Sequence, residues 1–157
     1  MLRLLGSEGE EFRLGVRGYE FPEIADATDK WDFNWLIVSG EVSCPRGRWQ
    51  FRDPCLLTFE VEALADRLRD VQAPGSQREL SFVEPNLRLE HVEETGDATL
   101  LVAFSQESSP PWATEQERYG GGYELCFPLR LNDVSAASAA VESMLAKWPI
   151  RKWPEAG

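Results

Sequence analysis

Residues 34–52 read NWLIVSGEVSCPRGRWQFR, and this stretch decides the fold class. Its first half, residues 34–44, opens with consecutive apolar side chains, which is typical of a central β-strand with both faces buried. Residues 45–47 then supply turn formers. Beyond them Trp49 and Phe51 alternate with polar neighbours, and this period of two predicts a strand with one packed and one wet face. Together the two halves predict a β-hairpin.

The same alternation marks other parts of the chain. It predicts an early strand over residues 12–16 and a second hairpin from residues 87–91 and 100–104. The most regular alternation runs over residues 123–131, where a single strand is predicted throughout. Three glycines, 120–122, precede that strand and are expected to let the chain turn sharply into it.

Two stretches have the spacing of amphipathic helices. Apolar residues three or four apart predict a helix over residues 61–71, and an alanine-rich run predicts another over residues 134–148, with Asn132 and Asp133 as candidate N-caps. The order of elements predicts an α+β fold, a mainly antiparallel β-sheet with two helices packed against it. A single domain is expected over residues 1–157, with a core at about 5–149 and a short tail at 150–157.

Charge narrows the class of partner. The chain has 16 Lys and Arg against 27 Asp and Glu, a formal net charge of -11. A polyphosphate is bound through cationic patches, so nucleic acid is not expected as a partner, whereas a basic protein would be attracted. No segment resembles a signal peptide or approaches membrane-spanning length, which predicts a cytoplasmic protein without membrane contact. Acidity that serves only solubility is the simpler alternative.

Motifs for catalysis or cofactor binding are not found. The three cysteines lack metal or redox spacing and are expected to be small buried side chains. His91, the one histidine, shares the apolar side of its strand and is expected to be packed and hydrogen-bonded. We therefore expect no cofactor, no metal site and no enzyme activity. An enzyme that uses a carboxylate pair stays open as an alternative, with Glu84, Glu90 and Glu107 as unranked candidates.

The most regular charge pattern places an acid at every third position of one loop. This pattern indicates a solvated loop, a docking surface for a basic partner or, least of all, a cation site. Trp112 follows two prolines in a second irregular stretch, residues 108–122, where it could anchor an interface or pack onto the sheet. The candidate partner-binding residues are thus Glu20, Glu23, Asp26, Asp29, Asp32 and Trp112.

An ordered series of short motifs resembles a known family. GYEFP at residues 18–22, NWL at 34–36, EPNL at 84–87 and PPW at 110–112 follow one another as in the WapI-type immunity proteins and their bacterial relatives. The likeness extends over nearly the whole chain and includes DPC at 53–55.

The resemblance implies a specific activity without chemistry. By this resemblance the chain would act as the best-understood members do, as an antidote that binds and blocks the tRNA-cleaving C-terminal region of a contact-dependent WapA-type toxin. The implied partner is therefore a basic nuclease toxin domain, bound stoichiometrically. A self-associating adaptor remains a further alternative, and the sequence leaves the oligomeric state open.

Overall fold

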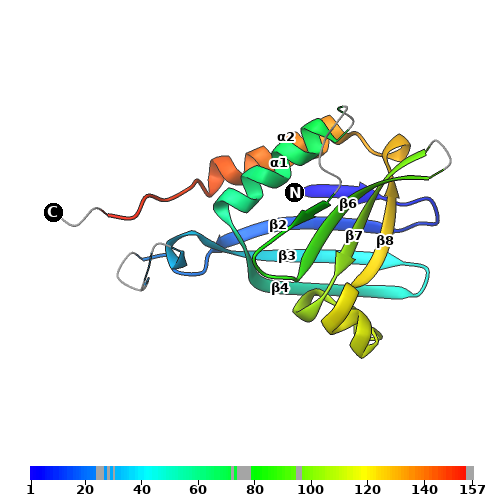
Figure 1. The fold of residues 1–157 in the computed structure, drawn as a ribbon. Coiled ribbons are helices and arrows are strands. Elements are labelled where there is room, and N and C mark those ends of the chain that lie inside the picture. Colours follow the sequence, from blue (N-terminus) through cyan, green and yellow to red (C-terminus); the bar gives the residue numbers. More distant parts are fainter. Residues whose placement is uncertain are drawn as a thin grey trace.

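The computed structural model describes residues 1–23, 27, 29, 31–71, 73, 79–94 and 97–154. Within these residues, eight strands form two antiparallel four-stranded sheets, ordered β1-β2-β3-β4 in sheet A and β5-β6-β7-β8 in sheet B. Two α-helices lie side by side along one side of the molecule (Figure 1). The predicted α+β class and its antiparallel pairing are confirmed, and the structure adds that the strands divide between two sheets.

The bounds of the elements are as follows. Sheet A contains β1 Leu2–Leu5, β2 Glu11–Tyr19, β3 Trp35–Cys44 and β4 Gly47–Leu57. Sheet B contains β5 Glu79–Ser81, β6 Leu87–Glu94, β7 Asp97–Phe104 and β8 Tyr123–Pro128. The helices are α1 Thr58–Asp70 and α2 Val134–Lys147. Short helical turns are η2 Asp32–Asn34, η3 Gln106–Ser108, the π-helical η4 Glu117–Gly121 and η5 Leu129–Leu131.

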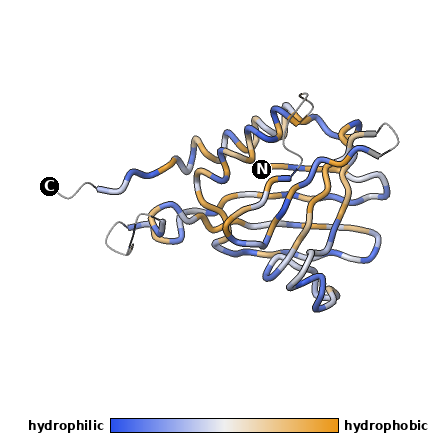
Figure 2. The backbone as a smooth tube through the Cα atoms, in the orientation of Figure 1, coloured by the Kyte–Doolittle hydropathy of each residue, from blue (hydrophilic) through white to orange (hydrophobic). Residues whose placement is uncertain are grey.

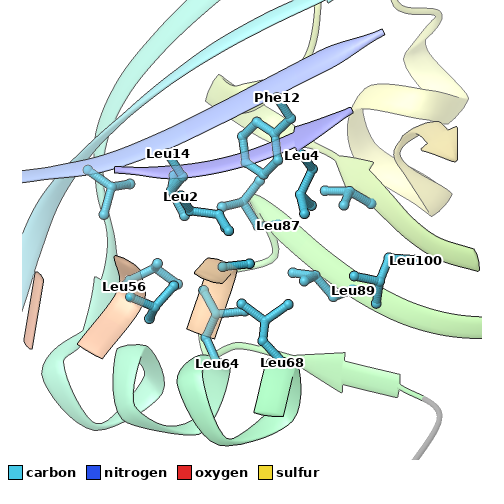
Figure 3. Packing of buried hydrophobic residues seen from close by; sticks show 14 of the residues in the cluster. Leu2, Leu4, Phe12, Leu14, Leu56, Leu64, Leu68, Leu87, Leu89 and Leu100 are labelled. Carbon is cyan, nitrogen blue, oxygen red and sulfur yellow. The ribbon is translucent and has the colours of Figure 1, made fainter. Parts of the chain in front are cut away.

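The inner faces of the two sheets form one hydrophobic core with α1 and α2. Phe12 of sheet A contacts Phe104 of sheet B edge to face, with ring centroids 5.1 Å apart. Leu64 and Leu68 of α1 point into the same core (Figure 3). Along β4 the buried Trp49 and Phe51 alternate with the exposed Arg48, Gln50 and Arg52, and Figure 2 shows both hydrophobic and hydrophilic positions along the strands of the sheets.

The predicted hairpins and both helices are confirmed, but one strand is shorter than expected. Residues 34–52 form β3 and β4, with β3 in the interior of sheet A. The strand predicted over residues 123–131 ends at Pro128, because the chain then forms η5 and leaves Leu131 38% exposed. Gly122 has φ +91° just before β8, as expected of a residue that turns the chain there. None of the described helices has the length and apolarity that a bilayer span requires.

Two expectations about single residues were right only in part. Cys55 is buried, but Cys44 is half-buried and Cys126 is exposed, because Cys126 lies on the outer side of β8 while its neighbours face the core. His91 is half-buried on the same side of β6 as Leu89, opposite Leu100 of β7. Its Nε2 is buried and has no hydrogen-bond partner in the part of the chain that the structure describes.

A candidate protein-docking surface

Segments far apart in the sequence meet at the end of the fold where β2 leaves sheet A and β3 enters it (Figure 1). They are the loop after β2 with η2, the start of α1, the turn between β5 and β6, part of β4, and η3. We call their exposed or half-exposed side chains the acidic end, and it consists of Glu20, Asp29, Trp31, Asp32, Asp53, Phe59, Glu84 and Glu107.

Asp29 shapes the turn that presents an aromatic pair. Its Oδ1 accepts hydrogen bonds from the backbone N–H of Trp31 (2.7 Å) and of Asp32 (3.0 Å), which begins η2 in the way that an Asx turn does. The Trp31 ring then contacts Phe59 of α1 edge to face at 5.7 Å. Trp31 is 48% exposed and Phe59 37% exposed, so the pair offers apolar surface to solvent.

The segment after α2 holds this loop in place. The amide of Asn34 exchanges two hydrogen bonds with the backbone of Arg151, at 2.8 and 2.9 Å, and its Oδ1 also accepts from Thr58 Oγ1 at 2.7 Å. The Arg151 guanidinium lies over the rings of Tyr19 and Phe33, 4.3 and 4.1 Å from their centroids. Loop, helix and C-terminal segment are thus fixed to one another.

Glu60 fastens a second loop to the same end. This side chain is buried, and its two oxygens accept from the backbone N–H of Leu57 (2.9 Å) and of Val83 (2.6 Å). The first hydrogen bond satisfies a backbone N–H at the start of α1. The second fixes the turn that contains Val83 and Glu84 against the first turn of α1. Burial raises the pKa of Glu60, the two backbone bonds oppose that rise, and Glu84 adds to it.

Two carboxylates share one amide beside this loop. Asn86 Nδ2 donates to Asp53 Oδ2 at 3.2 Å and to Glu107 Oε2 at 3.3 Å, so it lies between them. Burial raises the pKa of Asp53, and the charges of Glu107 and Glu84 raise it further. One amide donor therefore holds two like-charged carboxylates side by side.

Electrostatic effects connect the acids across the whole end. Burial raises the pKa of Glu20, and the neighbouring charges of Asp32 and Asp53 add to the rise. The carboxylates of three segments are therefore close enough to repel one another. Among the described residues, no group of three or more side chains has the arrangement that a metal ion requires.

The structure brings together part of the predicted site. Glu20, Asp29 and Asp32 belong to the acidic end, and Glu23 is exposed on the same loop. Asp26 lies outside the described residues. Of the carboxylates considered for catalysis, Glu84 and Glu107 also lie at this end, whereas Glu90 pairs with Arg88 at 2.8 Å on the outer face of sheet B.

Trp112 is not part of the acidic end: its side chain packs beside Gly47, the first residue of β4. Its ring contacts Trp49 at 5.5 Å and Tyr123 at 6.2 Å, the Arg46 guanidinium lies 5.8 Å from it, and Gly47 leaves room for it. The indole is half-buried, and its contacts are those of a side chain packed on the sheet. A role for Trp112 in binding a partner stays a prediction.

Trp31, Phe59 and Asp53 were not predicted as site residues. Asp53 lies in β4 and Phe59 in the first turn of α1, so no local pattern links them to the acids after β2. The one local signal in the sequence was that Phe59 falls outside the apolar spacing of its helix, which indicates an exposed side chain.

Comparison with known families gives one match. The family model described as the immunity protein WapI-like family matches residues 3–149 of the 157-residue chain. A search of curated proteins found no match.

Proposed function

Because the chain belongs to the WapI-like immunity protein family, we propose that it neutralises a toxin domain by stoichiometric binding through the acidic end. One observation carries the choice of surface: carboxylates from four segments gather at the same end of the fold as the exposed Trp31–Phe59 pair. An apolar centre ringed by polar groups is the usual anatomy of a protein interface, and aromatic side chains supply much of its binding energy.

We further propose that the partner is basic, as a tRNA-cleaving domain must be at its RNA-binding surface. An acidic surface then covers the groups that would hold the phosphates. Complementary charge also raises association rates toward about 10⁸ M⁻¹s⁻¹ at low salt, which suits an antidote that must act before damage occurs.

The energetics of the acids support a binding role. Burial and neighbouring acids raise the pKa values of Glu20 and Asp53, so the charged forms of these two carboxylates are less favourable in the folded protein than in the unfolded chain. Binding sites commonly keep such unfavourable charges because a ligand relieves them. A cationic partner would relieve these.

The test uses a WapA-type tRNA-cleaving toxin domain as the partner and compares two sets of three neutralised acids. The changes at the acidic end are Glu20→Gln, Asp53→Asn and Glu84→Gln. The matched control changes three exposed acids elsewhere: Glu8→Gln, Glu93→Gln and Glu115→Gln. Stopped-flow association at several salt concentrations should show a rate about tenfold lower at low salt, with a shallower salt dependence, for the acidic-end variant alone.

A further variant, Trp31→Ala, separates packing from charge. It should speed dissociation and leave the association rate nearly unchanged, because short-range contacts act on the bound state. Protection of tRNA in a cleavage assay should fall with affinity. Equal effects of the two sets of neutralised acids would reject the acidic end as the contact surface, and the absence of any complex with the toxin domain would reject the proposed function.

A further inference from the structure

Positive charge gathers on one face of this acidic protein. The inward residues of β1 to β4, such as Leu14, Val42 and Trp49, are buried, so the residues that alternate with them face solvent. The charged residues on this outer face of sheet A are five arginines and two glutamates, a local charge of +3 in a chain of -11: Arg3, Glu11, Arg13, Arg17, Glu41, Arg48 and Arg52. We call it the arginine face.

The arginine face is hollowed along β3. Two adjoining depressions of about 530 and 330 Å³ share Glu41 and Gln50 in their lining. Ser39 and Ser43 lie in the middle strand, with Arg52 and Arg48 opposite them on β4. Small side chains between longer ones make a groove with a polar floor and cationic walls.

Three of these arginines make no ion pair within the part of the chain that the structure describes. One of them, Arg17 on β2, donates to Ser39 Oγ at 2.8 Å, and the other two lie on the opposite wall of the groove. These two are Arg48 and Arg52, both exposed on β4, which is an edge strand of sheet A. By contrast, Arg3 and Arg13 both donate to Glu11, at 2.8 and 2.5 Å. The β4 wall of the groove therefore carries cations that a ligand could pair without breaking an existing ion pair.

We propose that the arginine face is a second docking surface, which binds an extended acidic segment of another protein. Arg48 and Arg52 are four residues apart on one strand, about 13 Å, and acids four residues apart on an extended peptide have the same spacing. Guanidinium groups bind carboxylates in bidentate geometry. This surface is distinct from the acidic end and its occupant is of opposite charge, so it goes beyond toxin binding.

The groove fits a polypeptide better than a nucleic acid. Glu41 lies in the middle of it and would face a continuous phosphate backbone, whereas a peptide can place an uncharged or basic residue there. The aromatic residues in its lining, Trp49 and Phe51, are each 6% exposed and cannot stack on bases.

Fluorescence anisotropy with the full chain tests the proposal. The probe is a fluorescein-labelled dodecapeptide with glutamate at every fourth position and serine elsewhere; the comparison probes are its glutamine counterpart and an oligouridylate of equal charge. The double variant Arg48→Glu, Arg52→Glu should lower peptide affinity at least about tenfold. The control Arg130→Glu, Lys152→Glu changes net charge equally at exposed positions off this face and should alter affinity less than about twofold.

The outcomes are decisive once circular dichroism shows that both variants are folded. Acid-dependent peptide binding that is lost only in the Arg48, Arg52 variant supports the proposal. Tighter binding of oligouridylate, equal loss in both variants, or no peptide binding by the unaltered chain overturns it. Self-association in sedimentation that the Arg48, Arg52 changes abolish would assign the groove to a second copy and overturn it too.

Discussion

At the scale of single residues, Glu60 does the most to assemble the acidic end. It is a buried carboxylate that fixes two backbone N–H groups from segments more than twenty residues apart in sequence. The pKa of Glu60 is raised because burial disfavours the charged carboxylate more than the two backbone hydrogen bonds favour it. Glu60 is therefore retained for the geometry it imposes on α1 and the Val83 turn.

Replacing Glu60 tests this role. Glu60→Ala leaves the buried N–H of Leu57 without its acceptor and should lower the free energy of unfolding by about 1–2 kcal/mol, measured by urea denaturation at neutral pH. Glu60→Gln keeps one carbonyl oxygen and should lose less. An alanine variant as stable as the parent would show that water replaces the carboxylate without penalty.

The sequence revealed only part of this surface at the residue scale. The spacing of Glu20, Asp29 and Asp32 was visible because they share one loop. Asp53 and Phe59 join them only through the pairing of β3 with β4 and the contact between η2 and α1. Local patterns do not carry such long-range contacts.

At the scale of elements, two adjacent residues before α2 have different roles, although the sequence predicted both as N-caps. Asp133 is the cap, since its Oδ1 accepts from Ala136 N at 2.9 Å. Asn132 instead joins strands: it accepts from Leu5 N at 2.7 Å and donates to the carbonyls of Leu5 and Pro128 at 2.9 and 2.8 Å. The Asn132 amide therefore bonds both the N–H and the carbonyl of Leu5 at the end of β1, as the backbone of a neighbouring strand would.

The two alanine variants should therefore differ. Asp133→Ala should cost about 1 kcal/mol, with faster hydrogen exchange confined to the first turn of α2. Asn132→Ala loses three bonds, should cost about 1–3 kcal/mol and should expose the Leu5 amide. Hydrogen exchange followed residue by residue measures both, and identical exchange patterns would contradict this division of roles.

Elements that depend on pairing were the ones that the sequence did not predict. β5 has three residues, and β1 has only four, so neither gives a long periodic signal. The expectation of irregular structure over residues 108–122 was wrong at η4. Thr114 and Glu117 form a capping box at the start of this helical turn: Glu117 N donates to Thr114 Oγ1 at 3.1 Å, and Thr114 N donates to Glu117 Oε2 at 2.7 Å. The sequence TEQE at 114–117 has the spacing of such a box and could have predicted the turn.

At the scale of the whole molecule, charge is segregated between the acidic end and the arginine face. The net value of -11 therefore describes neither surface. Segregation lets one small protein present opposite potentials in different directions, and it makes the sign of each acid's effect on stability depend on where the acid lies.

This dependence gives a prediction about pH. Burial and neighbouring acids raise the pKa values of Glu20 and Asp53 in the folded state. Their favourable contribution is thus present below the unfolded pKa values and is lost as pH rises through the folded ones. The variant Glu20→Gln, Asp53→Asn should be more stable than the parent at neutral pH, by up to about 1 kcal/mol after solvent screening, and equally stable near about pH 3.

Glu11 on the arginine face supplies the matched control of opposite sign. Hydrogen bonds from Arg3 and Arg13 lower the pKa of Glu11, so its contribution is present above the unfolded pKa and disappears as pH falls through the folded one. Glu11→Gln should therefore destabilise the protein at neutral pH, and thermal unfolding across pH measures both variants. If both variants shifted stability in the same direction at neutral pH, the segregation of charge would not govern the stability of this fold.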